Sequence, residues 1–408
     1  MKTKTLPRIF IFILIYISSG ALWSNTQLFE VAYLQEAYLL VLIIFTLVYF
    51  SRKTMLSEGV VAEEVFIILL VFFLMLVPSF FAYFSFEQPF YFGLIEERRA
   101  LSYLVFFPIY FALRNENISP IWIVNVILAV CLINLVNSVW FFLNIRAEYV
   151  IETINSMNAR FDRAIIGAYY MFFAYFYLLW DWVKKNRKLN LLFLFVILFY
   201  FILLVQSKQM IGVLLLVTAF VMVGHLKKSM WLLTTSSTLL LLIYWLVDLG
   251  DFIEKYQVVI NAVIGGGESI RSKTATLIIN DLSETMFILG KGSLSLLWND
   301  GFHSIFGEHF YLSDVGLLGM YYKLGVLAIP LTVIYYGFFM HCYFRLGKLR
   351  LHVIPLAAVT FVLCSMVLNA LVPVIEYNGY NMSVILALLA GYYRSVPLIR
   401  KKGKEGYV

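Results

Sequence analysis

Runs of about 20 apolar residues recur along almost the whole chain, and this recurrence constrains the fold more than any other feature. A helix needs about 20 such residues to cross the hydrocarbon core of a bilayer, which is about 30 Å thick. Hydrophobic residues make up 62% of the 408 positions and charged residues 13%, which is more apolar surface than a water-soluble fold could bury. The sequence therefore predicts an all-α polytopic integral membrane protein.

About twelve transmembrane helices are predicted within a single transmembrane domain that covers residues 1–408. They fall at residues 7–24, 33–50, 60–84, 99–113, 119–143, 164–182, 189–206, 209–224, 230–247, 315–344, 352–372 and 378–396. The stretch 189–224 is divided because it is too long for one span and polar at its middle. Segment 99–113 is short enough to be re-entrant. The first span resembles a signal peptide but is interpreted as uncleaved, since no soluble domain follows it.

Lys and Arg are distributed unequally between the two sides of this topology. About two thirds of the 31 basic residues lie on the side of the two termini, mostly in short loops, and cytoplasmic loops carry such an excess. Both termini are therefore predicted to be cytoplasmic. The net charge of +7 then lies along the inner membrane surface, facing anionic lipid, and does not indicate binding to nucleic acid.

One long connection, residues 249–314, interrupts the spans on the outer side. Its apolar stretches at 276–279 and 286–289 predict short helices that pack back on the membrane rather than a disordered linker. Gly265–Gly267 is expected to form a hinge or a turn. Most of the acidic residues also lie on the outer side, so the chemistry is expected there.

Four outer cations are candidate phosphate ligands. Arg160 and Arg163 lie on one helical face at the mouth of the sixth span, where two guanidinium groups could grip a phosphate through bidentate hydrogen bonds. Interfacial snorkelling, or pairing with Asp162, is the alternative. Lys208 interrupts an apolar stretch, where a charge is costly and often functional, or else it marks a tight hairpin at the surface. Arg271 in the long loop is the fourth candidate, although a loop arginine alone is more often solvated.

Titratable groups gather where the long loop re-enters the membrane. The group comprises His303, Glu308, His309 and Asp314. A histidine or carboxylate at this boundary could act as a general base on a sugar hydroxyl, and a satisfied interfacial residue is the alternative for each of them. Lys323, deeper in the same span, either lines a cavity or snorkels outward.

Several other chemistries lack their sequence motifs. The chain has no P-loop, no dinucleotide glycine fingerprint, no G-x-S-x-G elbow and no Cys/His spacing typical of a metal site, so neither a cofactor nor a metal is expected. Cys131, Cys342 and Cys364 all fall in apolar spans, where buried, inert thiols are expected rather than a disulfide framework.

Four motifs, in order between about residues 60 and 396, are similar to those of the O-antigen polymerase (Wzy-type) and O-antigen ligase superfamily of polytopic membrane glycosyltransferases. They are an Arg-led start of a span from Arg160 to Gly167, the pair Ser207-Lys208, Arg271 followed by Leu289–Gly292, and His309-x-Tyr-Leu leading to Gly316–Gly319. Two positions depart from the pattern. Lys208 replaces the usual Arg, so a bidentate phosphate contact becomes a point charge. Phe310 stands where ligases carry Asn, which favours the polymerase branch.

The resemblance implies a GT-C-like, metal-independent glycosyltransferase at the outer face of a bacterial inner (plasma) membrane. A polymerase would join undecaprenyl-pyrophosphate-linked oligosaccharide repeat units into O-antigen or capsular polysaccharide. The leaving group is already on the donor, which fits the lack of a nucleotide motif. The pyrophosphate would be bound by Arg160, Arg163, Lys208 and Arg271, with His309 as the base and Asp314 orienting it. Besides the glycolipid and the bilayer, a chain-length regulator protein is the partner that this resemblance suggests.

Two other functions stay open at this point. One is an O-antigen ligase that transfers glycan to lipid A-core, and the other is a lipid-linked oligosaccharide flippase or another secondary transporter. Transporters place broken helices and polar sites near the bilayer midplane, often in paired halves. The predicted halves are unlike here, and polar groups gather in one outer loop, which favours an enzyme.

Overall fold

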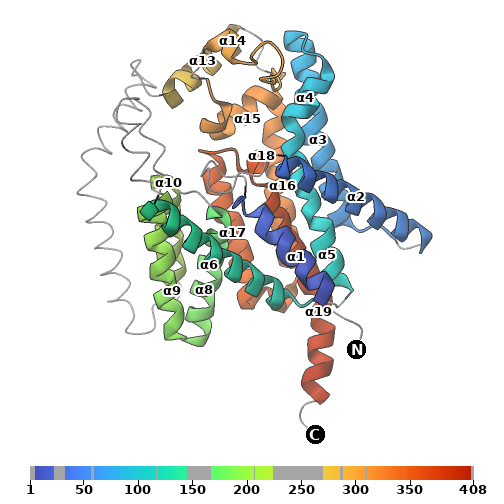
Figure 1. The fold of residues 1–408 in the computed structure, drawn as a ribbon, viewed down its shortest axis with the longest axis vertical. Coiled ribbons are helices and arrows are strands. Elements are labelled where there is room, and N and C mark those ends of the chain that lie inside the picture. The colour runs from blue at the N-terminus through green and yellow to red at the C-terminus, as the bar shows by residue number, and fades with distance from the viewer. Residues whose placement is uncertain are drawn as a thin grey trace.

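The computed structural model describes residues 5–22, 33–56, 59–115, 118–144, 167–205, 207–223, 270–284, 288–307 and 310–405. These residues are mostly helical and contain no strand, which confirms the all-α class. In Figure 1 the helices form a bundle with α13 (Ile270–Glu284) and α14 (His303–Phe306) at its upper end. Helix α1 (Thr5–Ser18) begins and α19 (Gly379–Glu405) ends at the lower end, so both described ends of the chain lie on one side.

Four helical segments of the described residues are long and apolar enough to cross a membrane. They are Leu34–Met55, Ala62–Phe86, Pro120–Trp140 and Gly316–Arg345. Five further apolar helices have 10–17 residues: Thr5–Ser18, Lys188–Ile202, Gln209–Val223, Val353–Asn369 and Gly379–Tyr392. The membrane class is thereby supported. The number of twelve spans stays a prediction, because the expected span at 230–247 lies outside the described residues.

Large apolar side chains on the outward faces of α2 (Leu34–Met55) and α3 (Ala62–Phe86) are exposed. Leu47 and Leu69 are each 63% exposed and Phe72 is 57% exposed. Scattered exposed apolar residues are normal in a soluble protein, but extended apolar faces mark contact with a partner or a membrane. These faces are therefore suited to contact with lipid or with a partner.

The helix that follows α3 begins earlier than the sequence predicts. Helix α4 (Phe90–Glu96) continues through the 3-10 helix η1 (Glu97–Val105) into α5 (Phe106–Arg114), so the predicted short span at 99–113 is wrong at its start. The charged run from Glu96 to Arg99 hides this helix from a hydropathy reading. Glu97 pairs with Lys323, and this pairing allows the charged run to form part of a helix that packs along α3.

The central helices follow the predicted order closely. They are α6 (Pro120–Asn144), α8 (Ala168–Lys185), α9 (Lys188–Phe199) with its π-helical end η2 (Tyr200–Val205), and α10 (Lys208–Val223). The predicted division of 189–224 is confirmed, since helix ends at Val205 and a new one begins at Lys208. A hydrogen bond of 2.9 Å between the hydroxyls of Thr218 and Tyr175 holds α10 against α8.

The predicted span at 315–344 is broken in two. It consists of α15 (Gly316–Leu324), the 3-10 turn η4 (Gly325–Leu327) and α16 (Ala328–Arg345). After it come η5 (Gly347–Leu351), α17 (Val353–Asn369), the single turn α18 (Val374–Tyr377) and α19. Helix α17 packs against α8, and α19 packs against α5 and η1, which together form the centre of the bundle.

The long connection at 249–314, which is predicted to be external, is folded where the structure describes it. Helix α13 confirms the helix expected at 276–279. Ile288 and Leu289 are exposed and lie in a turn, so the helix expected at 286–289 does not reach them, while residues 286–287 and Gly265–Gly267 lie outside the described part. Phe302 and Phe310 pack with Ile278 in a small apolar core at this end of the molecule.

Four helix ends meet in a cluster of ion pairs. Lys53 from the last turn of α2 pairs with the buried Glu64 in the first turn of α3, and the Arg114 Nη1 atom at the end of α5 lies 4.0 Å from Glu64 Oε1. Arg345 at the end of α16 pairs with Glu63 at 2.9 Å. All three cations belong to the side predicted to be cytoplasmic, so the structure brings members of that set to one place.

Candidate functional site

Lys323 on α15 lies between two carboxylates that come from distant parts of the chain. Its Nζ atom is 3.0 Å from Glu97 Oε1 and 3.0 Å from Glu376 Oε2. All three side chains are buried, and a buried charge is tolerated only when it is paired and hydrogen-bonded. The ion pairs join η1, α15 and α18, and we call these three residues the buried triad.

The long loop contributes a further hydrogen bond to the buried triad. The Ser293 hydroxyl donates to Glu97 Oε1. The Gln88 amide in turn holds the loop at two points, because its Nε2 donates to the Ser293 carbonyl at 3.1 Å and its Oε1 accepts from the Ser295 N–H at 2.7 Å. Gln88 and both serines are buried, so the loop is anchored in the α3–α4 turn.

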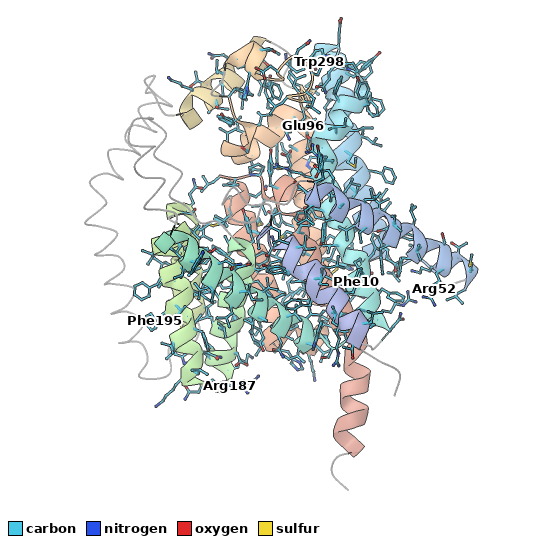
Figure 2. The ribbon with its side chains drawn as sticks, in the orientation of Figure 1. Phe10, Arg52, Glu96, Arg187, Phe195 and Trp298 are labelled. Atoms are coloured by element: carbon cyan, nitrogen blue, oxygen red, sulfur yellow. The ribbon has the colours of Figure 1, made fainter. Side chains whose placement is uncertain are left out.

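An aromatic ring also lies against the buried triad. The Tyr377 ring centroid lies 5.9 Å from Lys323 Nζ and 5.4 Å from Arg99 Cζ, distances at which a cation is attracted to the ring face. Glu96, labelled in the upper half of Figure 2, precedes the triad residue Glu97 directly. The charged run from Glu96 to Arg99 is thus placed away from the basic helix ends, towards the long loop.

The break between α15 and α16 is a backbone junction with the long loop. Val326 donates its N–H to the Ile288 carbonyl at 3.0 Å, and Gly292 donates its N–H to the Lys323 carbonyl at 3.0 Å. Gly325 has a φ of +59°, and a Cβ atom there would overlap the Ile288 carbonyl oxygen. Glycine is needed because only a residue without a side chain allows the loop to approach this closely.

We expect Gly292→Ala to destabilise the folded protein by about 2–4 kcal/mol. The φ of Gly292 is +82°, and an added Cβ would overlap the backbone of Pro78 and Ala82 on α3, so strain and overpacking add together. Thermal unfolding of the purified protein in detergent measures this loss. Gly337→Ala on α16 is the control, because its Cβ would meet no atom within 4 Å. Equal unfolding temperatures for the two variants would contradict the close approach.

A layer of aromatic and charged side chains lies above the buried triad. Tyr322, next to Lys323, donates its hydroxyl to Asp281 Oδ2 at 2.9 Å, and Lys291 pairs with the same oxygen at 3.5 Å. Phe302 and Phe310 pack around the Tyr322 ring with centroids 5.8 and 6.1 Å away. These contacts hold α13 and the described parts of the segment 288–312 on α15, so the described part of the long loop forms a solid cap on the bundle.

The predicted site residues are only partly within the described structure. Arg160, Arg163 and His309 lie outside it. Lys208 begins α10, Arg271 is the second residue of α13 and Asp314 ends the 3-10 helix η3 (Leu312–Asp314), and of these the structure describes the backbone alone. The arrangement of the six side chains therefore stays a prediction.

One hydrogen bond brings two of the predicted segments together. The Tyr311 N–H donates to the Thr274 hydroxyl at 3.3 Å. Tyr311 follows His309 by two residues, and Thr274 follows Arg271 by three, about one helical turn. Both α13 and η3 also pack against α15. The chain segments that carry Arg271 and His309 thus meet at the cap.

Sequence reasoning missed the buried triad. Lys323 neither snorkels outward nor lines an open cavity, because its side chain is buried and ion-paired. One signal was available: Lys323 lies well inside the predicted span 315–344, away from its ends, and a cation at such a position requires a counter-charge. Glu376, an acid between the last two predicted spans, and Glu97 were the candidates.

No protein-family model, no curated protein and no solved structure matches this chain. The fold and the site therefore define only the class of this protein. It is an all-α protein with helices long and apolar enough to cross a membrane and with a cap of loop segments on the bundle.

Proposed function

We propose that this protein is a polymerase that joins undecaprenyl-pyrophosphate-linked oligosaccharide units into O-antigen or capsular polysaccharide. The observation that carries the proposal is the Tyr311–Thr274 hydrogen bond, because it unites the segments of Arg271 and His309, two separate motifs of the resemblance. Both segments rest on the cap at the end of the bundle away from the described chain ends (Figure 1). A donor held at Arg271 would then be within reach of a base from the His309 segment.

The proposed reaction is a displacement at the anomeric carbon of the donor sugar. The acceptor hydroxyl forms a new C–O bond and gives its proton to His309, while the bond between the anomeric carbon and the pyrophosphate oxygen breaks. The departing pyrophosphate gains charge, and the proposed ligands Arg160, Arg163, Lys208 and Arg271 stabilise it. Fixed cations suit this task because they need no reorganisation when the charge develops.

The buried triad would serve as a foundation for this site. Lys323, Glu97 and Glu376 lie under the loop that connects α13 to η3, and Ser293 ties that loop to Glu97. Reacting groups must keep their positions within fractions of an ångström for catalysis, and a cap fixed to the bundle provides such rigidity. The triad itself is closed by its own ion pairs, so we assign it positioning rather than chemistry.

The proposal requires the cap to face outward and both termini to face the cytoplasm, in a bacterial inner membrane. The basic helix ends at Lys53, Arg114 and Arg345 support this orientation. We expect a topology reporter fused after Lys188 or Lys402 to read cytoplasmic and one fused near Gly266 to read external. An internal signal at Gly266 would place the cap on the wrong side for lipid-linked donors and overturn the proposal.

The purified protein is expected to extend undecaprenyl-linked repeat units in the presence of a chelator and without ATP. The energy resides in the pyrophosphate bond of the donor, and Arg and Lys take the role that a metal would otherwise play. Gel analysis of the glycolipid ladder measures the extension, with heat-denatured protein as the control. Strict dependence on a divalent metal, or on ATP, would contradict the mechanism.

The glycolipid ladder of a strain that lacks this protein distinguishes a ligase from a polymerase. Loss of long chains with a single capped unit retained is expected for a polymerase, whereas loss of every capped unit would indicate a ligase.

A secondary transporter is the second candidate, and the buried triad beside the broken span favours it. Transporters use interrupted helices and buried ionisable groups, and Lys323 lies two residues before the break at Gly325. Proteoliposomes that move lipid-linked oligosaccharide across the bilayer without extending it would support transport. Chain extension in detergent, where no compartments exist, would support the polymerase.

A further inference from the structure

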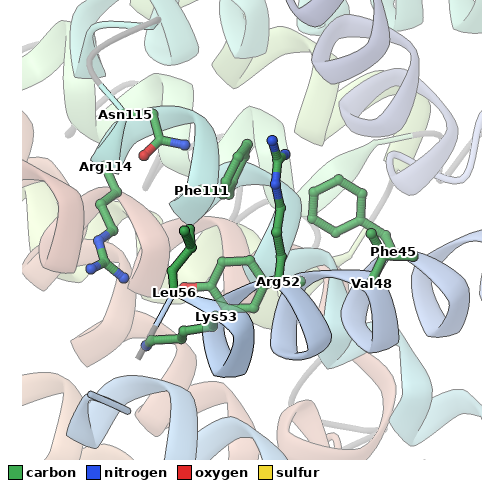
Figure 3. A pocket seen from close by; sticks show the side chains of 9 residues that line it. Phe45, Val48, Arg52, Lys53, Leu56, Phe111, Arg114 and Asn115 are labelled. Carbon is green, nitrogen blue, oxygen red and sulfur yellow. The ribbon is translucent and has the colours of Figure 1, made fainter. Parts of the chain in front are cut away.

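A pocket of about 240 Å³ opens between the last turns of α2 and α5, at the end of the bundle that holds the basic helix ends. It is lined by Phe45, Val48, Tyr49, Arg52, Lys53, Leu56, Phe111, Arg114 and Asn115. Figure 3 shows the Arg52 side chain rising from α2 beside the rings of Phe45 and Phe111, with Arg114 and Asn115 at the other side of the pocket. The lining therefore combines an apolar wall with a cationic rim.

The cations of this rim are only partly neutralised by their neighbours. Lys53 and Arg114 share the buried carboxylate of Glu64, which also accepts a 2.5 Å hydrogen bond from the Tyr49 hydroxyl. Arg52 is exposed and forms no ion pair with a described carboxylate. The C-terminal ends of α2 and α5 add partial negative charge, about half a unit each. The three positive charges of Arg52, Lys53 and Arg114 exceed the sum of this charge and that of Glu64. An anion in the pocket would thus meet a guanidinium that no carboxylate of the described residues neutralises.

The apolar wall of the pocket continues onto the lipid-facing side of α2. Val48 lines the pocket and is 58% exposed, and Ile44 and Leu47 are exposed one turn or less before it. A free inorganic anion would leave these side chains and the Phe45 ring uncovered. A lipid would fill both regions, with its phosphate at Arg52 and its acyl chains along α2.

We propose that this pocket binds the phosphate headgroup of an anionic phospholipid from the adjoining leaflet. Arg52 is the direct ligand, and its planar fork matches the phosphate oxygens. Arg114 and Asn115 flank the headgroup, and the acyl chains lie against Ile44 and Val48. This site is independent of the proposed polymerase activity, since it lies at the opposite end of the bundle from the cap.

Native mass spectrometry of the full chain, released from detergent with phosphatidylglycerol or phosphatidylcholine, tests the proposal. We expect phosphatidylglycerol to be retained preferentially, and Arg52→Gln to weaken its apparent affinity about tenfold, with Arg52→Lys recovering part of the loss. Lys348→Gln, an exposed basic residue on η5, is the matched control and should retain the lipid as the unmodified chain does. Both substituted residues are exposed, so folding is not at stake.

Three results would overturn the proposal. The first is equal retention of phosphatidylcholine, which would show that the charge is not read. The second is displacement of phosphatidylglycerol by millimolar inorganic phosphate, which would indicate an ion site without lipid. The third is unchanged affinity in Arg52→Gln.

Discussion

Replacement of Lys323 by Met is expected to destabilise the protein by about 3–5 kcal/mol, the largest effect that we foresee for a single substitution. The ammonium group lies 3.0 Å from Glu97 and 3.0 Å from Glu376, so its removal leaves two buried carboxylates facing each other without a counter-charge. Thermal unfolding in detergent, together with the yield of monodisperse protein, measures the loss. Lys348→Met is the control, because Lys348 is exposed on η5.

A rescue experiment separates this charge effect from lost packing. The triple variant with Lys323→Met, Glu97→Gln and Glu376→Gln removes all three charges and keeps similar volumes, so it should recover much of the lost stability. If the triple variant is as unstable as Lys323→Met alone, the ion pairs are not the source of the effect. A normal unfolding temperature for Lys323→Met would exclude a structural role for the buried triad.

The fold was predictable from sequence wherever hydropathy alone decides it. The spans along α1, α2, α3 and α6 follow from uninterrupted apolar runs, because a lipid environment selects helices with little polar content. The division before Lys208 was predictable for the same reason, since a polar stretch cannot lie in the middle of a single long span.

Other features depend on contacts between residues far apart in sequence, which hydropathy cannot register. The helical segment α4–η1 contains a charged run, for which hydropathy alone predicts a loop. Its helical conformation is explained by the pairing of Glu97 with Lys323, which lies 226 positions later. The break at Gly325 is equally hidden, because it is the approach of Ile288 that requires glycine. Lys291 reads as an ordinary outer cation, yet it pairs with Asp281 and lies 5.9 Å from the Phe86 ring centroid.

The candidate site likewise has a part that the sequence predicts and a part that depends on contacts between distant residues. Sequence motifs predict that Arg271 and His309 belong to one site, and the Tyr311–Thr274 bond brings the neighbouring chain segments together. The roles of Arg160, Arg163, Lys208 and Asp314 stay predictions from the resemblance. In substitution experiments on these residues, Lys291 would not serve as a neutral control. Its replacement would also remove the pair with Asp281 that helps to hold the cap.

Replacement of Arg271 by Ala is expected to abolish long-chain glycan in cells while leaving the amount of protein intact. The reason lies in the charge that the pyrophosphate develops as its bond to the sugar breaks, because a cation that contacts it in the transition state affects turnover more than binding. Removal of one such donor typically lowers the rate about 10²–10³-fold. The glycolipid ladder and the initial rate of extension by purified protein measure the effect.

Two further variants test the chemistry of that arginine. Arg271→Lys should recover only part of the activity, because an ammonium group lacks the bidentate fork. Lys273→Ala is the matched control, since Lys273 is an exposed cation on the same helix, two positions away, and should stay near wild-type activity. Equal losses in Lys273→Ala and Arg271→Ala would show that general outer charge matters, and would remove Arg271 from the site. A fully active His309→Ala would remove the proposed base while leaving the arginine ligands in place, because proton transfer and pyrophosphate binding are separate tasks within the same step.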